Sequence, residues 1–204
     1  KLADNLPREG QLSGRNKLIN GAMQIWQRGT SFTNSSAAYN ADRWSVDNNA
    51  GGGGQSTDAP DGFTYSLKID PSSGNAALRQ AIELSAAGEG GVFRSGQKFT
   101  LSFYIKSDNV SSPSGATYWT GFQLEEGDTA TDFEHRTFGD EMFRCQRYCQ
   151  RHPSQDQSDG GSYTILGATG WAASTTEVNV PMILPTTMRI EPTATFSGNW
   201  RIVH

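Results

Sequence analysis

The chain has 204 residues, which is enough for one sizeable β-domain or two small ones with a packed core. Hydrophobic residues make up 35% of it, against about 45–50% in globular proteins, while 10% of residues are aromatic, which is typical of a folded, strand-rich chain rather than a disordered one. A net charge of −4 without a basic block excludes nucleic acid as an expected partner, and no apolar run approaches the roughly 18 residues that membrane insertion needs.

The first predicted segment is a connector. Residues 1–15 are polar, contain proline and glycine, and show no periodicity, so we expect them to extend from an upstream region. After it, Ile19, Met23 and Ile25 fall on one alternating face, which predicts a strand weakened by Gly21.

Further strands are predicted along the next hundred residues. A short strand is expected at 43–47, and the glycine-rich run 51–62 has the composition of a flexible loop. Apolar and polar residues alternate clearly over 63–70 and 99–106. Residues 78–84 fit either a strand or a helical turn.

The segment 118–125 also alternates, which predicts a strand with Tyr118, Thr120, Phe122 and Leu124 on one face. The eleven polar residues 107–117 before it can close a hairpin with 99–106, making the two strands antiparallel neighbours.

One helix is predicted at about 138–150. Phe138, Met142, Cys145 and Cys149 are spaced by four, three and four residues, so we expect them to pack against the sheet. Although His152 follows at helical spacing, zinc normally takes four ligands, and buried thiols are favoured over a metal site. No metal and no cofactor is expected.

Short β-like runs punctuated by proline return after residue 153. The sequence therefore predicts an all-β protein with a jelly-roll or β-sandwich domain over 16–152, including the short helix, and a second β-rich region over 153–204.

Three stretches carry a resemblance to a known family. They are NKLINGAMQIWQRG followed by ADRW, then LRQAIE followed by FTLSFYIKS, and then GFQLEEGDTATDFEHR followed by CQRY. In this order they resemble phage and prophage tail-fibre or virion appendage proteins of the marine podovirus and cyanophage type. The motif residues that carry the resemblance are Asn20, Gly21, Trp26, Gln27, Arg28, Asp42, Arg43, Trp44, Gln123, Glu125, Phe133, Glu134, Arg136, Cys145, Gln146, Arg147 and Tyr148.

The resemblance implies a fibre component of the virion that forms a homotrimer, contacts other tail proteins and carries a sandwich similar to carbohydrate-binding modules. We therefore expect attachment to host cell-surface polysaccharide or lipopolysaccharide. Relatives have more strands where this chain has only 107–117. Either the sandwich is trimmed or residues are absent from this link. We expect absent residues, because apolar faces such as those of Phe103 and Phe122 would otherwise be poorly covered.

Candidate binding residues are tryptophans, because flat rings stack on sugar faces. Trp119, Trp171 and Trp200 are the candidates, whereas Trp26 and Trp44 are expected in the core. The acidic residues between Glu125 and Glu134 could serve a polysaccharide-degrading, tailspike-type enzyme, but structural roles are favoured and no catalytic residue is expected. A purely structural virion protein, such as a head appendage or fibre connector, is the other alternative.

Overall fold

The structure is a computed structural model that describes residues 14–33, 38–47, 50–71, 77–83, 93, 95–108, 115–152, 155–156, 162–163, 170–181 and 183–195. The chain divides into two compact units at Cys145 and Gln146. Within the described residues, no helix is long and apolar enough to cross a membrane.

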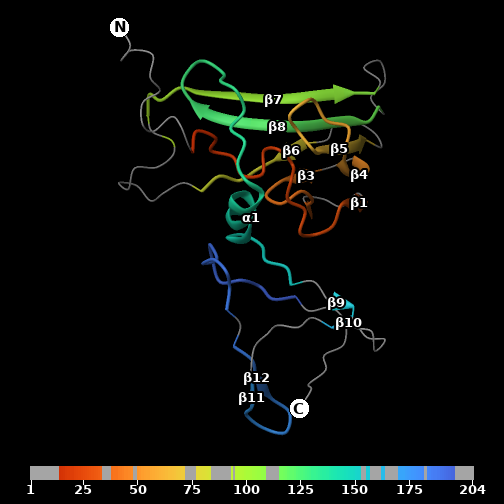
Figure 1. Ribbon diagram of the computed structural model, residues 1–204, viewed down its shortest axis with the longest axis vertical. Coiled ribbons are helices and arrows are strands. Elements are labelled where there is room, and N and C mark those ends of the chain that lie inside the picture. The colour runs from red at the N-terminus through yellow and green to blue at the C-terminus, as the bar shows by residue number, and fades with distance from the viewer. Residues whose placement is uncertain are drawn as a thin grey trace. The chain divides into compact units, whose positions relative to one another are not determined.

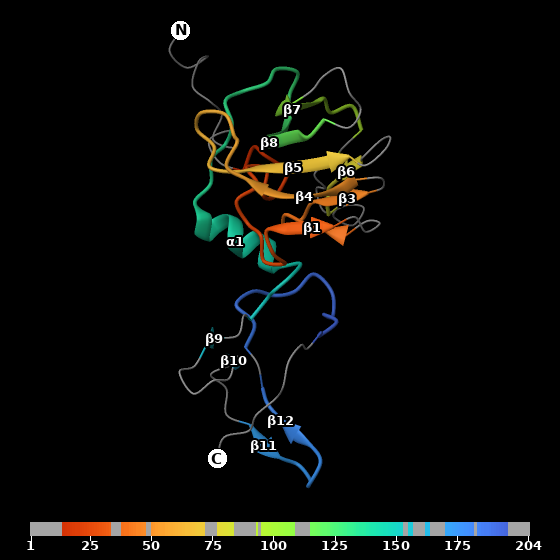
Figure 2. The same cartoon turned by 90° about the vertical axis from the view of Figure 1, so that its right-hand side faces the viewer.

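The main feature of the first unit is a five-stranded antiparallel sheet in the order β1-β4-β5-β8-β7 (Figures 1 and 2). Its strands are β1 (Ser31–Thr33), β4 (Ala50–Ser56), β5 (Ser66–Pro71), β7 (Phe99–Ser107) and β8 (Thr117–Glu126). The predicted strands at 99–106 and 118–125 are confirmed as antiparallel neighbours, and the strand predicted at 63–70 is confirmed for its second half. The prediction of absent residues concerns a link of which residues 109–114 lie outside the described part.

A three-stranded sheet accompanies it, with β2 (Ala38–Tyr39), β3 (Ser45–Asp47) and β6 (Ala77–Arg79) in the order β2-β3-β6. The strand predicted at 43–47 is thus confirmed in β3. Residues 78–84, which fit either a strand or a helical turn, begin in the short strand β6.

The prediction that 51–62 is a flexible loop is wrong for its first half, because the glycines form β4 between β1 and β5. Backbones approach so closely there that a Cβ at Gly53 would overlap the carbonyl oxygen of Lys68, and one at Gly54 would overlap that of Thr30. Only glycine fits such contacts, so a composition typical of loops here serves a strand.

A β-bulge in β8 changes which side chains share a face. Ser102 pairs with Gln123 but Tyr104 pairs with Thr120, so β8 carries one extra residue. Gly121 occupies this position with a φ of +67°, a conformation that glycine adopts at little cost. The predicted face is therefore wrong: Phe122 and Leu124 lie with Trp119, and Thr120 points the other way.

The alternating strand predicted through Ile19, Met23 and Ile25 is also wrong. Residues 14–30 form turns, with φ of +57° at Asn20 and +54° at Met23. Leu18 and Met23 nevertheless reach the core, whose other buried members are Ala41, Trp44, Val46, Leu67, Ile69 and Phe122.

Part of the sheet is left outside this core. Phe122 is buried, contrary to expectation, whereas the expectation that Phe103 is poorly covered is confirmed, at 43% exposed. Its neighbours in β7, Leu101 and Ile105, are 54% and 52% exposed.

The helix α1 spans Phe138–Gln146, four residues less than predicted, so Cys149 lies outside it. Thr137 caps its start by accepting a hydrogen bond from the Asp140 amide at 3.2 Å. Cys145 is buried as predicted, but Cys149 is only partly buried and Phe138 is exposed. Arg144 faces outward and pairs with Asp140 one turn earlier.

Among its described residues, the second unit has four two-residue strands, which form two antiparallel pairs. They are β9 (Gln155–Asp156) with β10 (Ser162–Tyr163), and β11 (Trp171–Ala172) with β12 (Val178–Asn179). The mostly β class with one short helix is confirmed for the described residues, whose strands form open sheets without jelly-roll closure.

Candidate functional site

The motif residues near the N-terminus hold a tight loop. The side-chain oxygen of Asn20 accepts hydrogen bonds from the amides of Gln24 and Ile25, at 2.8 and 2.9 Å. Its amide nitrogen donates to the carbonyls of Ile25 and Asp42, both at 2.9 Å. The Trp44 indole donates to the Asn20 carbonyl at 2.9 Å, so one buried asparagine organises the whole turn.

Asp42 ties the same loop to the segment before β3. One of its oxygens accepts the Gln27 amide at 3.0 Å, the other accepts the Gln27 side chain, and Arg28 lies 3.5 Å away. Burial raises the pKa of Asp42 above its usual range, and the contacts with Gln27 and Arg28 only partly oppose this.

Gln123 and Glu125 hold the segment that follows β8. The Gln123 side chain accepts the Glu134 amide at 2.8 Å and donates to Glu125 at 3.0 Å. Glu125 accepts both the amide and the hydroxyl of Thr131, at 2.9 and 2.6 Å. These two buried side chains therefore close the loop between the sheet and α1.

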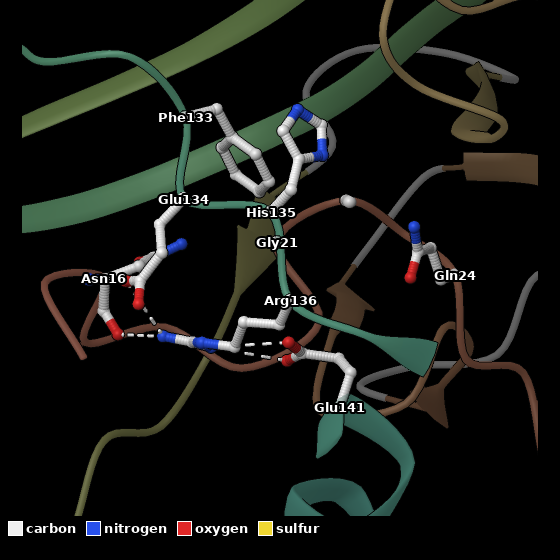
Figure 3. A pocket seen from close by; sticks show the side chains of 9 residues that line it. Asn16, Gly21, Gln24, Phe133, Glu134, His135, Arg136 and Glu141 are labelled. Atoms are coloured by element: carbon white, nitrogen blue, oxygen red, sulfur yellow. Dashed lines mark hydrogen bonds and ion pairs between the residues drawn. The ribbon is translucent and has the colours of Figure 1, made fainter. Parts of the chain in front are cut away.

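A buried charged cluster joins this loop to the N-terminal segment (Figure 3). Arg136 lies between Glu134 and Glu141, at 3.6 and 3.4 Å, and donates to the carbonyls of Asn16 and Leu18. Glu134 in turn accepts the amides of Gly14 and Asn16, at 2.5 and 2.6 Å. We call Glu134, Arg136 and Glu141 the charged junction.

The cavity at the charged junction has about 10 Å³ of space, which suffices for a single water molecule at most. Burial alone would raise the pKa of Glu134, but hydrogen bonds from Asn16 and Gly14 and the charge of Arg136 outweigh it, and the pKa lies below its usual range. The pKa of Glu125 is lowered in the same way by Thr131, against burial. A glycosidase acid needs a raised pKa, so these two carboxyls fit structural roles.

Other motif residues are likewise engaged inside the protein. Trp26 donates to the Met23 carbonyl at 2.7 Å, and Arg43 donates to the Ala81 carbonyl. Burial raises the pKa of the Cys145 thiol far above its usual range, which makes it a poor nucleophile. Gln146, Arg147 and Tyr148 belong to the second unit, where the Arg147 carbonyl accepts the amide of Arg189 at 2.9 Å.

The tryptophans proposed as glycan contacts occupy different surroundings. Trp119 lies on the core side of β8, stacked on Phe122 with ring centroids 6.2 Å apart. Trp171 is in the second unit and is 61% exposed. Trp200 lies outside the described residues. Glycan contact by these three side chains stays a prediction.

The opposite face of the sheet carries a groove with about 200 Å³ of space. Tyr104 and Lys106 of β7 lie beside Thr120 and Tyr118 of β8, their register partners, and the loop after β4 closes one side through Asp58. We call this depression the sheet groove and define it by six of its lining residues, Asp58, Ser66, Tyr104, Lys106, Tyr118 and Thr120.

Sequence reasoning missed this groove because it concentrated on tryptophan and on the apolar half of each alternating strand. The signal was present, since Tyr104 interrupts the polar half of 99–106 between Ser102 and Lys106. Asn16 and Glu141, which lie at the charged junction, were also missed. Nothing local in the sequence marks their partners, which are more than 100 residues away.

Comparisons of the chain with protein families, curated proteins and solved structures found no match.

Proposed function

We propose that this chain is a non-catalytic structural and binding component of a bacteriophage virion, part of a tail fibre that attaches the particle to host surface glycan. In this proposal its β-domain is a jelly roll of the carbohydrate-binding type, and it works as a homotrimer joined to other tail proteins. The basis is the resemblance of the motif residues, together with the way in which the chain uses them.

The observation that carries the proposal is a difference between two sets of polar residues, those of the family motif and those of the sheet groove. Motif residues with ionisable groups, such as Asp42, Glu134 and Arg136, bind backbone groups and one another inside the domain. The outer sheet face instead presents Tyr104 and Lys106 to solvent. Such an arrangement favours recognition by an exposed surface over chemistry by a buried centre.

A glycan-retardation experiment tests the attachment function. The full chain is run through native gels that contain host capsule, lipopolysaccharide or unrelated polysaccharide, and we expect slower migration in a host glycan. If no polysaccharide retards the chain, the purely structural alternative is favoured. Release of reducing ends during incubation would instead favour the enzyme alternative.

Location on the particle needs a second experiment. Gold-labelled antibody raised against the purified chain should decorate the tail fibres of a phage that encodes it. Decoration of the head alone would contradict the tail-fibre assignment and favour a head appendage.

A further inference from the structure

The sheet groove combines an exposed aromatic ring with an ion pair. We infer that it binds a neutral pyranose residue of a surface polysaccharide, with the sugar face on Tyr104 and the hydroxyls on Lys106 and Asp58. This inference rests on the proposed attachment function and assigns it a site and a ligand class.

Tyr104 is positioned as a stacking platform. Tyr104 is 52% exposed, and its ring lies against Phe63, with centroids 5.4 Å apart. A Cβ at Gly121 would come within 2.6 Å of the same ring, so the glycine of the bulge makes room for it against β8. A half-exposed ring that is held in place by its neighbours loses little freedom when a flat apolar surface stacks on it.

Hydrogen-bonding groups surround this platform. The Lys106 ammonium lies 2.5 Å from Asp58 and 5.5 Å from the centre of the Tyr118 ring. Since an ammonium has three donors and a carboxylate has two acceptor oxygens, the pair retains capacity for sugar hydroxyls. The floor is formed by Ser66 and Thr120, both 1% exposed, whose hydroxyls donate to backbone carbonyls.

The charge of the groove selects against acidic sugars. Asp58 balances Lys106, and Asp108 adds a further negative charge at the rim, where it accepts the Tyr118 hydroxyl at 2.9 Å. Lys68 is likewise balanced, by Asp70 at 3.0 Å. A uronate or sialate carboxylate would meet net negative charge here, whereas the hydroxyls of a neutral hexose would not.

The groove has room for only part of a polysaccharide. Its space of about 200 Å³ is below the roughly 300–1,000 Å³ of pockets for drug-sized ligands. One sugar ring of a polysaccharide therefore fits, with the neighbouring rings in solvent. The affinity of a whole fibre for the polysaccharide would come from several copies of the protein acting together.

The test measures retardation of the full chain in gels containing neutral polysaccharides (mannan, dextran and galactan) or the polyuronate alginate. We expect a neutral polymer to retard the wild type and alginate to have little effect. Tyr104→Ala should weaken binding by about tenfold, while Tyr104→Phe should retain most of it. The matched control is Tyr39→Ala, which removes a tyrosine that is 41% exposed outside the groove and should leave binding unchanged.

A charge-changing variant tests the ligand class separately. Asp58→Asn keeps the shape of the side chain but leaves Lys106 unbalanced, so binding of alginate should rise relative to that of the neutral polymers. Urea midpoints of all variants, compared with the wild type, identify any that fail to fold.

The outcomes separate the inference from the function on which it rests. Wild-type binding that survives Tyr104→Ala in a folded protein would overturn the groove and leave glycan attachment standing. Retardation of the wild type by alginate alone would overturn the neutral ligand class. Absence of retardation by every neutral, acidic and host polysaccharide would overturn both the inference and the attachment function.

Discussion

Asn20 shows what a single polar residue does in the first unit. Its side chain makes four hydrogen bonds, and its φ of +57° lies in the left-handed region that asparagine tolerates better than most residues. Gly21 follows, and a Cβ there would overlap the carbonyl oxygen of Phe122. The pair Asn-Gly thus fixes a loop against β8, although the same dipeptide elsewhere signals a hairpin turn.

We predict that Asn20→Ala destabilises the protein by about 2–4 kcal/mol, because buried amides and carbonyls lose their partner. The measurement is the free energy of unfolding in urea. Gln24→Ala is the matched control, because the Gln24 side chain lies in the same loop and makes no hydrogen bond in the described residues. Its removal should change stability by less than about 1 kcal/mol. Equal losses in the two variants would contradict this role of Asn20.

Glu134 predicts a dependence of stability on pH. Its pKa is lowered in the folded protein, so its contribution is present above the ordinary value of about 4.3 and is lost as pH falls through the folded pKa. Asp42 has the opposite sign, because its pKa is raised and its contribution declines as pH rises. The two effects must therefore be separated by mutation.

We expect Glu134→Gln to lower stability at pH 7 and to reduce the further loss between pH 5 and pH 3, measured as urea midpoints. The control Glu126→Gln changes an exposed carboxylate outside the charged junction and should keep the pH profile of the wild type. An unchanged profile in Glu134→Gln would show that other carboxyls govern acid unfolding.

Among the elements, β4 depends on the absence of side chains. Three backbones are brought together by Gly52, Gly53 and Gly54, which pair with β1 on one side and with β5 on the other. Glycine weakens an ordinary strand through its conformational entropy, by roughly 0.5–1 kcal/mol per residue. The strand forms because both of its edges are paired and because the close approach excludes any larger residue.

We predict opposite effects for two glycine-to-alanine substitutions. Gly53→Ala should lower the free energy of unfolding by about 2 kcal/mol or more, because its Cβ would overlap the Lys68 carbonyl. Gly139→Ala in α1 meets nothing within 4 Å and should raise it by about 0.5–1 kcal/mol through helix propensity. Stabilisation by Gly53→Ala would show that β4 is not formed as described.

These elements also show why the sequence predicted some strands and missed others. Alternation of apolar and polar residues identified β7 and β8, because successive side chains of a strand point to opposite faces of the sheet. It failed where the backbone decides, as in the glycines of β4, the bulge at Gly121 and the left-handed turn at Asn20. The candidate site was missed for a related reason: Asp58 and Lys106 meet only after folding, from positions 48 residues apart.

For the whole molecule, the important feature is an edge strand with apolar side chains in solvent. β7 ends the five-stranded sheet, and its core-side residues Leu101, Phe103 and Ile105 remain about half exposed. Exposed apolar area is unfavourable by about 25 cal/mol per Å². Soluble proteins usually charge or cover such an edge, so an association that buries it is favoured.

The proposed tail-fibre function predicts that the full chain sediments as a homotrimer, and the exposed edge predicts that β7 lies in the contact between copies. Leu101→Lys places a charge on the exposed side of that strand and should shift the sedimentation equilibrium towards the monomer, because burying an unpaired ammonium is costly. The matched control is Thr33→Lys in β1, the strand at the opposite edge of the same sheet, where the residue is exposed and polar. If the control dissociates the trimer equally, the contact does not involve β7, and a wild-type chain that sediments as a monomer at all concentrations would contradict the trimer itself.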